Sequence, residues 1–203
     1  NTVFALSSLA AFLNYGATAA VTFLLSLYLQ YIKGLTPREA GLLLVAQPVM
    51  QAIFSPLAGS LSDRVQPRVV ASIGMSLTVV GLILLSLLSE ATSVGYIVGS
   101  LALLGFGFAL FSSPNSNAIM GSVERRLYGV ASGILGTMRL TGQMFSMGAA
   151  MIVFAVHMGR AQITPEYYGR LVESARILFG GFAGLCTAGV FASLARGKVE
   201  RKT

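Results

Sequence analysis

The amino-acid sequence predicts an all-α membrane protein, a bundle of six transmembrane helices. The chain of 203 residues is 55% hydrophobic and only 10% charged, with a mean hydropathy of +0.77, whereas ordinary globular domains carry about a quarter charged residues. Its 23 glycines suit helices that approach each other closely in lipid, where no hydrophobic force drives them together. Long runs without any charge are the third observation, because a helix in water must keep one solvated face.

The charge-free runs define the spans in order. They cover residues 1–32, 40–62, 69–89, 91–123, 140–156 and 177–195. A helix needs about 20 apolar residues to cross the hydrocarbon core, and the fifth run reaches that length when it is extended across Arg139 to residue 127. We therefore expect six spans at about residues 5–31, 40–62, 69–88, 95–120, 128–156 and 177–195.

Local signals mark the ends and bends of these spans. Residues 36–39, Thr-Pro-Arg-Glu, place a capping residue, a first-turn proline and a glutamate at capping-box spacing before the second span. Pro48, Pro56 and Pro114 remove backbone donors, so we expect kinks at these positions. The connection 157–176 leaves two alternatives open, a short interfacial helix that leads into the last span or a solvated loop.

The distribution of lysine and arginine predicts the orientation in the membrane. One set of connections carries eight basic residues, Arg64, Arg68, Arg125, Arg126, Arg196, Lys198, Arg201 and Lys202. The alternate set carries five, Lys33, Arg38, Arg160, Arg170 and Arg176. The larger set is expected in the cytoplasm, which places both termini on the cytoplasmic side of a plasma (inner) membrane. Since the chain starts at Asn1 without an initiator methionine, we expect residues 1–203 to be a fragment of a longer protein.

Several function classes are excluded by composition. The formal net charge of +7 does not indicate nucleic-acid binding, because the basic residues are scattered among short connections. A single cysteine, Cys186, and a single histidine, His157, leave no zinc cluster and no Cys/His dyad. We therefore expect no enzyme, metal site, cofactor or nucleic-acid partner. All seven acidic residues lie in predicted connections or the tail, so a proton-coupling carboxylate would have to come from outside this chain.

A charged segment separates the second and third spans. Residues 59–68 match the pattern Gly-x-Leu-(Ser/Ala)-Asp-Arg-x-Gly-Arg-(Arg/Lys) at Gly59, Leu61, Ser62, Asp63, Arg64 and Arg68, and depart from it at Gln66 and Pro67. The segment resembles the cytoplasmic loop of major facilitator superfamily transporters. That resemblance implies that Gly59, Asp63, Arg64 and Arg68 form a conformational latch that stabilises one face of a transport cycle. A plain topogenic turn is the alternative. We refer to residues 59–68 as the latch loop.

Further segments resemble the branch of that superfamily formed by fourteen-helix drug:proton antiporters. They are residues 28–30 and 34–41, residues 111–115, and residues 129–133 followed by Arg139 and Gln143. The resemblance implies that the chain is the carboxy-terminal six-helix half of a facilitator fold, built from two inverted three-helix repeats. It also implies an amino-terminal half as partner, a central cavity between the halves and alternating access.

Arg139 is the charge that the sequence places inside a span. A charge at mid-membrane costs about 2.5–3.5 kcal/mol, so it is kept for a partner or a wet cavity. Gln143 lies one turn further on the same helix face. The alternative is that Arg139 extends to the cytoplasmic interface, about 16 Å away at Tyr128. The full set of cavity candidates is Arg139, Gln143, Asn14, Tyr15, Gln47, Gln51 and Asn115, although membrane amides also serve only to tie helices together.

These observations predict secondary active transport, with this chain as one half of the transporter. The expected activity is proton-coupled efflux of small amphipathic compounds or drugs, with membrane lipid, a small-molecule substrate and the amino-terminal half as partners. Facilitated or coupled transport of a polar metabolite is the first alternative. A membrane scaffold that self-associates through its glycine faces without transporting is the second.

Overall fold

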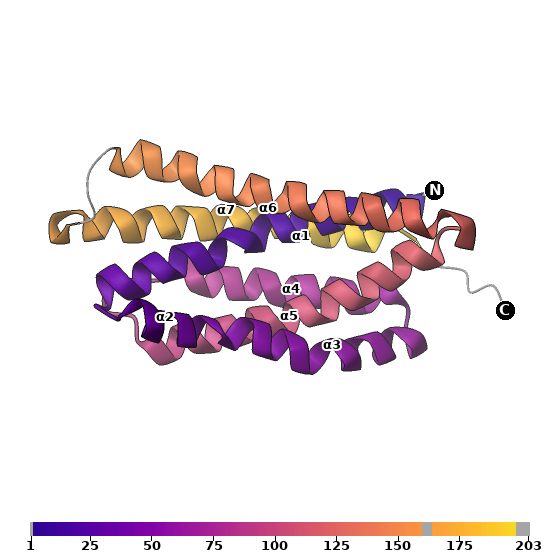
Figure 1. The fold of residues 1–203 in the computed structure, drawn as a ribbon, viewed down its shortest axis with the longest axis horizontal. Helices are drawn as coiled ribbons and strands as arrows, with labels where there is room; N and C mark the ends of the chain where they lie inside the picture. The colour runs from indigo at the N-terminus through magenta and orange to yellow at the C-terminus, as the bar shows by residue number, and fades with distance from the viewer. Residues whose placement is uncertain (1, 160–163, 198–203) are drawn as a thin grey trace.

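The computed structural model describes residues 2–159 and 164–197, apart from the side chain of Asp63. Its elements are α1 (Thr2–Leu27), the π-helix η1 (Tyr28–Ile32), α2 (Pro37–Leu44), α3 (Ala46–Arg64), α4 (Pro67–Ser86), α5 (Val94–Gly121), the 3₁₀ turn η2 (Arg125–Leu127), α6 (Tyr128–Met158), the 3₁₀ turn η3 (Pro165–Tyr167) and α7 (Tyr168–Ala195). The long helices lie side by side in one bundle (Figure 1). Within the described ranges, six helical segments are long and apolar enough to cross a membrane, which confirms the predicted fold class.

The packing of the helices has an internal symmetry. The segment α1 packs mainly against α6 and α7, while α5 packs mainly against α3 and α4, and α4 packs against α7. Exchanging α1 with α5, α3 with α6 and α4 with α7 maps these contacts onto one another. The exchanged helices run in opposite directions, because the second member of each pair comes three membrane crossings after the first. The bundle therefore consists of two inverted three-helix repeats, as the family resemblance implied.

Glycines allow the closest helix approaches. A Cβ atom added to Gly74 of α4 would lie 2.6 Å from the carbonyl oxygen of Gly107, and one added to Gly107 of α5 would lie 2.8 Å from the carbonyl oxygen of Gly74. Between α1 and α6, a Cβ atom on Gly142 would lie 2.6 Å from the carbonyl oxygen of Phe12. Larger residues at these positions would push the helices apart, which is the expected use of glycine in membrane bundles.

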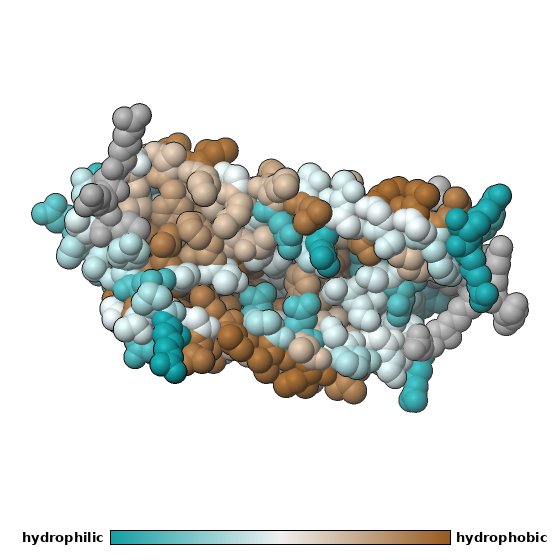
Figure 2. All heavy atoms as spheres, in the orientation of Figure 1, coloured by the Kyte–Doolittle hydropathy of each residue, from teal (hydrophilic) through white to brown (hydrophobic). Residues whose placement is uncertain are grey.

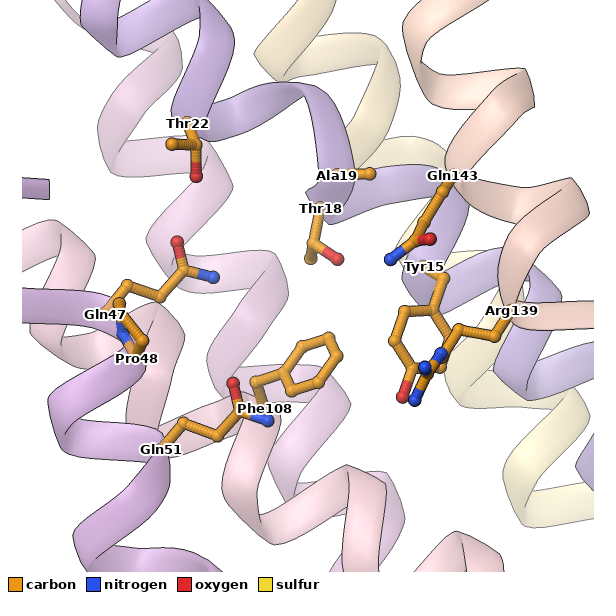
Figure 3. Close-up of a pocket in the computed structure, with 10 residues that line it drawn as sticks. All are labelled: Tyr15, Thr18, Ala19, Thr22, Gln47, Pro48, Gln51, Phe108, Arg139 and Gln143. Carbon is orange, nitrogen blue, oxygen red and sulfur yellow. The ribbon is translucent and has the colours of Figure 1, made fainter. Parts of the chain in front are cut away.

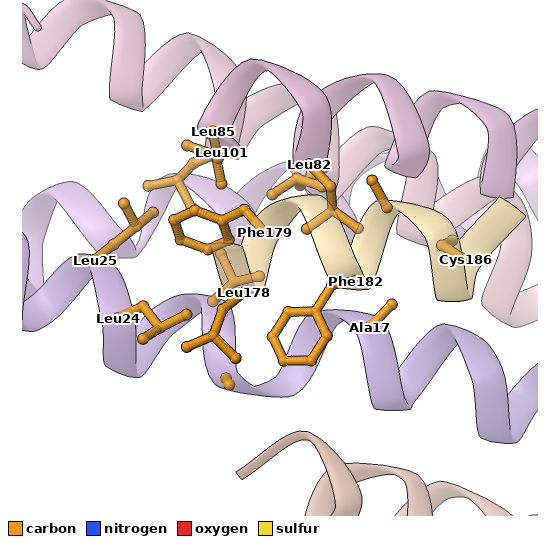
Figure 4. Close-up of a cluster of buried hydrophobic side chains, with 14 of the residues drawn as sticks. Ala17, Leu24, Leu25, Leu82, Leu85, Leu101, Leu178, Phe179, Phe182 and Cys186 are labelled. Carbon is orange, nitrogen blue, oxygen red and sulfur yellow. The ribbon is translucent and has the colours of Figure 1, made fainter. Parts of the chain in front are cut away.

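The apolar core lies where α1, α4, α5 and α7 meet. Figure 4 shows Leu24 and Leu25 of α1 packed with Leu178, Phe179 and Phe182 of α7. The segments α3 and α6 take little part in it. In the most apolar stretch of the span that contains α3, only 6% of the residues are buried within the bundle. The corresponding share is 17% for the span that contains α6 and 39–61% for the other four spans. On the face shown in Figure 2, apolar patches lie along the edges, and hydrophilic residues gather at both ends and around a hollow near the middle.

The structure refines two details of the sequence expectations. The second span is divided at Val45 into α2 and α3, because Pro48 has no N–H to donate to Leu44 and its ring crowds that carbonyl group. Pro56 and Pro114 lie inside the continuous helices α3 and α5, and the kinks expected at these two positions stay a prediction. The last helix begins at Tyr168, nine residues before the predicted position 177. The second half of the connection 157–176 is thus an extension of α7 and not a separate interfacial helix.

The predicted cap of the second span is confirmed. The Thr36 hydroxyl group accepts a hydrogen bond from the Glu39 backbone N–H at 3.3 Å, and the Glu39 carboxylate accepts one from the Thr36 backbone N–H at 2.9 Å. Both halves of the capping box are therefore formed, and they fix the start of α2.

Candidate functional site

A polar pocket of about 340 Å³ opens near the middle of the bundle, between α1, α3, α5 and α6 (Figure 3). Its walls combine hydroxyl, amide and guanidinium groups with a few apolar side chains. The lining residues are Tyr15, Thr18, Ala19, Thr22, Gln47, Pro48, Gln51, Phe108, Arg139 and Gln143. Five of the predicted cavity candidates are thereby brought together from three helices, namely Tyr15, Gln47, Gln51, Arg139 and Gln143.

Arg139 and Gln143 form the α6 wall of the pocket. The guanidinium carbon of Arg139 lies 5.8 Å from the ring centroid of Tyr15, which is within the range of a cation–π contact. Arg139 forms no ion pair in the described part of the chain, where the one ion pair joins Arg126 to Glu124 at the surface. The side chain of Arg139 thus stays in the pocket and presents an unneutralised positive charge there.

Gln47 and Gln51 form the opposite wall. They lie one turn apart at the start of α3, directly after the break at Val45, and Figure 3 shows them across the open space from Arg139 and Gln143. Phe108 of α5 closes the base of the pocket, with its ring at 5.1 Å and 75° to the ring of Tyr15. None of the described lining residues is acidic. The pocket can therefore offer hydrogen bonds and one positive charge, but no carboxylate.

The other two candidates, Asn14 and Asn115, do not line this pocket. Asn14 is fully buried, and its Oδ1 atom accepts a long hydrogen bond of 3.7 Å from the thiol of Cys186. Asn115 donates to the backbone oxygen of Ser7 at 3.1 Å and accepts from the guanidinium of Arg196 at 2.6 Å. Both amides connect helices within the bundle, which is the alternative that the sequence left open for any membrane amide.

Arg196 is the polar residue that sequence reasoning missed. It follows the last span directly, where the sequence suggests a cytoplasmic tail, yet only 1% of its surface is exposed. Its Nη1 atom donates to the Ser7 hydroxyl group at 3.1 Å as well as to Asn115. Burial, with a smaller contribution from nearby Arg68, lowers the pKa of Arg196 to about 10, so the group stays charged at neutral pH. No local pattern indicates this cluster, because its members lie 81 and 189 residues apart.

The latch loop comprises the end of α3, a two-residue connection and the first two residues of α4. The helix α3 ends at Arg64, and Pro67 occupies the first turn of α4. Gln66 has φ −55°, so glutamine fits where the family pattern has glycine, and Pro67 fits the first turn of α4 where the pattern has arginine. Asn117 of α5 donates to the Ser62 hydroxyl group at 2.8 Å, and this contact ties the end of α3 to α5.

The predicted latch residues have different surroundings. A Cβ atom on Gly59 would lie 3.0 Å from the Ser113 hydroxyl group, so α3 approaches α5 closely there. Arg64 is exposed, while Arg68 is half-buried near Arg196. The side chain of Asp63 lies outside the described residues. A latch role for these residues stays a prediction.

Comparison with known proteins identifies one family. Residues 7–202 match the family model of the Major Facilitator Superfamily. The chain is 36% identical over 155 residues to an uncharacterized transporter, YebQ, of Escherichia coli, which covers 76% of this chain and 34% of that protein. It is 31% identical over 136 residues to the riboflavin transporter RibZ of Clostridioides difficile, with 67% and 29% covered. It is 33% identical over 128 residues to the multidrug resistance protein Stp of Mycobacterium tuberculosis, with 63% and 24% covered. The chain therefore spans about a third or less of the length of these relatives.

Proposed function

The chain belongs to the major facilitator superfamily and is an integral membrane protein, and we propose that it forms the carboxy-terminal half of a secondary transporter for small amphipathic compounds. The observation that carries this proposal is the central pocket, in which Arg139, Gln143, Gln47 and Gln51 converge from two helices at mid-bundle. Unpaired polar groups are costly inside a membrane protein, so their gathering around a hollow supports a binding role.

The exposed helices support the assignment to one half. The symmetry-related segments α3 and α6 flank the pocket and bury few of their own residues within the bundle. A second six-helix bundle placed against α3 and α6 would cover these faces and complete the pocket from the other side. The amino-terminal half of the same transporter is the partner we propose for this position.

The proposal of an amphipathic substrate is supported by two neighbouring hollows along α1 and α6, one polar and one apolar. Beyond the polar pocket, a second hollow of about 330 Å³ follows the same two helices toward the end where α6 stops. Its walls include Phe23, Leu27, Met151 and Phe154, and the rings of Phe23 and Phe154 lie 6.3 Å apart. A ligand with a polar head at Arg139 and an apolar body along this path would match both regions. Met side chains also adapt to apolar ligands of different shapes.

Proton-coupled efflux is the direction and energy source that we propose. Similarity to a multidrug resistance protein supports efflux. The proton-binding carboxylate would have to come from the amino-terminal half, because the described pocket residues include no acidic group. Both termini are proposed to face the cytoplasm, on the basis of the excess of basic residues on that side.

Transport of a polar metabolite is the second candidate function. Three glutamine amides, the Tyr15 hydroxyl group and two threonines in the pocket suit a neutral solute with many hydrogen-bonding groups. Similarity to a riboflavin transporter supports this candidate.

The test is a transport assay on the intact protein in cells. We expect efflux of a fluorescent amphipathic dye that stops when a proton uncoupler is added, and a strong loss of efflux in Arg139→Ala. The matched control is Arg38→Ala, which removes an exposed arginine at the start of α2, outside the pocket. Uptake of riboflavin without dye efflux would favour the metabolite carrier. Absence of both activities would contradict a transport role and favour a scaffold.

A further inference from the structure

A third hollow, of about 740 Å³, lies at the end of the bundle away from the latch loop, where α4 ends and α7 begins. It is formed by the last residues of α4, the connection that follows α4, and the first three turns of α7. None of the helices that line the central pocket contributes a residue to it. The hollow is therefore a separate feature of the fold that the proposed transport function does not use.

The charges around this hollow are not neutralised by the protein. The Nε atom of Arg176 donates to the backbone oxygen of Ser86 at 3.1 Å, which fixes the guanidinium at the rim. Its other nitrogens form no hydrogen bond to described residues. The carboxylates of Glu90 and Glu173 form no ion pair or hydrogen bond in the described part of the chain, and Lys33 donates to the backbone oxygen of Glu90 instead. One cation and two anions thus face the same space with free bonding capacity.

Two glycines keep the hollow open. Gly169 and Gly180 of α7 line it, and a Cβ atom added to either one would meet no other atom within 4 Å. Helix packing therefore does not require glycine at these positions, although glycine costs about 1 kcal/mol relative to alanine in a helix. Val172 and Ile177, which lie between these glycines on α7, and Leu87 at the end of α4 supply apolar walls. The hollow thus joins a zwitterionic rim to an apolar groove at the depth where a transmembrane helix ends.

We propose that this hollow binds a phospholipid with an ethanolamine headgroup. The phosphate is bound by the free nitrogens of Arg176, since guanidinium groups bind phosphate oxygens with paired hydrogen bonds. The primary ammonium donates hydrogen bonds to the carboxylates of Glu173 and Glu90. The first part of an acyl chain lies in the groove beside Ile177 and Gly180. This inference does not depend on the proposed transport function.

The residues of the hollow discriminate among headgroups. A choline headgroup has no N–H to donate and is usually recognised by aromatic rings, and none of the described lining residues is aromatic. A glycerol headgroup has no cation, so it would leave both carboxylates unpaired beside an anionic lipid. Among choline, glycerol and ethanolamine, ethanolamine is the headgroup whose ammonium can donate to the carboxylates while the phosphate binds Arg176.

The test measures lipid binding to the purified intact protein by native mass spectrometry. Phosphatidylethanolamine, phosphatidylcholine and phosphatidylglycerol with identical acyl chains are compared, together with soluble phosphoethanolamine. We expect preferential binding of phosphatidylethanolamine, weakened about tenfold in Glu173→Gln by the loss of a charge-assisted hydrogen bond. Equal binding of the three lipids, or equal binding of soluble phosphoethanolamine, would overturn the proposal.

A pair of glycine variants separates occupancy of the hollow from folding. Gly180→Leu places a side chain in the groove at a position where an added Cβ meets no atom within 4 Å, and we expect it to abolish the lipid preference. Gly184→Leu adds the same side chain one turn further along α7, where space is also open but outside the hollow. We expect this control to bind lipid like the unaltered protein. An equal loss of binding in both variants would contradict a specific site.

Discussion

Arg139 and Arg196 are two arginines of one chain in opposite situations. Arg139 lies within a membrane span but faces an open pocket, where its contact is the ring of Tyr15. Arg196 follows the last span but is buried and held by Asn115 and Ser7. The comparison teaches that the position of a charge relative to a span does not decide whether it is buried. The oxygen atoms of Ser7 and Asn115 satisfy the Nη1 atom of Arg196, while its Nε and Nη2 atoms are buried without a partner among the described residues.

The first way to test this contrast is to remove the amide beside each arginine. Asn115→Ala takes the nearest acceptor from a buried cation, so we expect the free energy of unfolding to fall by about 3 kcal/mol. Gln143→Ala, the matched change in the pocket, is expected to alter it by less than about 0.5 kcal/mol. Chemical unfolding in detergent measures both. Equal losses would show that the two arginines do not differ in structural role.

Asn115→Asp sharpens the same point. A carboxylate at this position would pair with Arg196 and neutralise the buried charge, so we expect stability to be kept or raised relative to Asn115→Ala. A protein as unstable as the alanine variant would indicate that the hydrogen bond that Asn115 donates to the Ser7 backbone oxygen matters more here than its acceptor oxygen.

The second prediction concerns Arg139. We expect Arg139→Ala to lower the transport rate about tenfold or more, since a charge-assisted contact with substrate is lost, while stability changes by less than about 0.5 kcal/mol. Arg139→Lys keeps the charge without the planar guanidinium, so its transport rate should lie between those of the unaltered protein and Arg139→Ala. Initial efflux rates, corrected for protein in the membrane, measure the effect. A loss of folded protein in Arg139→Ala would show that Arg139, like Arg196, is needed for stability.

A smaller effect is expected on the opposite wall of the pocket. Gln47→Ala and Gln51→Ala each remove a neutral hydrogen-bonding group, which corresponds to a change of about fivefold in substrate affinity. The concentration of substrate that gives half-maximal transport measures it. An unchanged value in both variants would place the substrate on the α6 side alone.

The latch loop is expected to show the smallest effect. If Asp63 stabilises one face of the transport cycle, Asp63→Asn lowers the transport rate about twofold to fivefold, the size of effect expected for the loss of one ionic contact. The amount of protein in the membrane should stay constant. Ser62→Ala, which breaks the contact with Asn117, is the structural comparison. Unchanged transport in Asp63→Asn would reduce the loop to a topogenic turn.

Much of the fold could be predicted because lipid imposes one simple rule on the sequence. Charge-free runs predicted all six spans to within a few residues, except where α7 begins at Tyr168, ahead of the charge-free run, and where Pro48 breaks the second span. The capping box at Thr36 was also readable, since its two partners are three residues apart. Properties that depend on local sequence were therefore accessible.

The candidate site was predictable only in part, because facing directions depend on distant helices. Gln47, Gln51, Arg139 and Gln143 share a pocket, and their spacing by one turn within each helix already placed each pair on one face. Asn14 has the same kind of side chain, but α7 covers its face of α1 with Cys186. Nothing in the sequence near Asn14 distinguishes these two cases.

The inverted symmetry of the bundle has a consequence for its ancestry. A unit that crosses the membrane three times ends on the side opposite to the one on which it began. A head-to-tail duplication of such a unit therefore places the second copy upside down, without any separate event that reverses its orientation. The exchange that relates α1, α3 and α4 to α5, α6 and α7 follows from this odd number of crossings. An ancestral three-helix unit must accordingly have been able to insert in both directions, with its loop charges and not its packing deciding which direction it took.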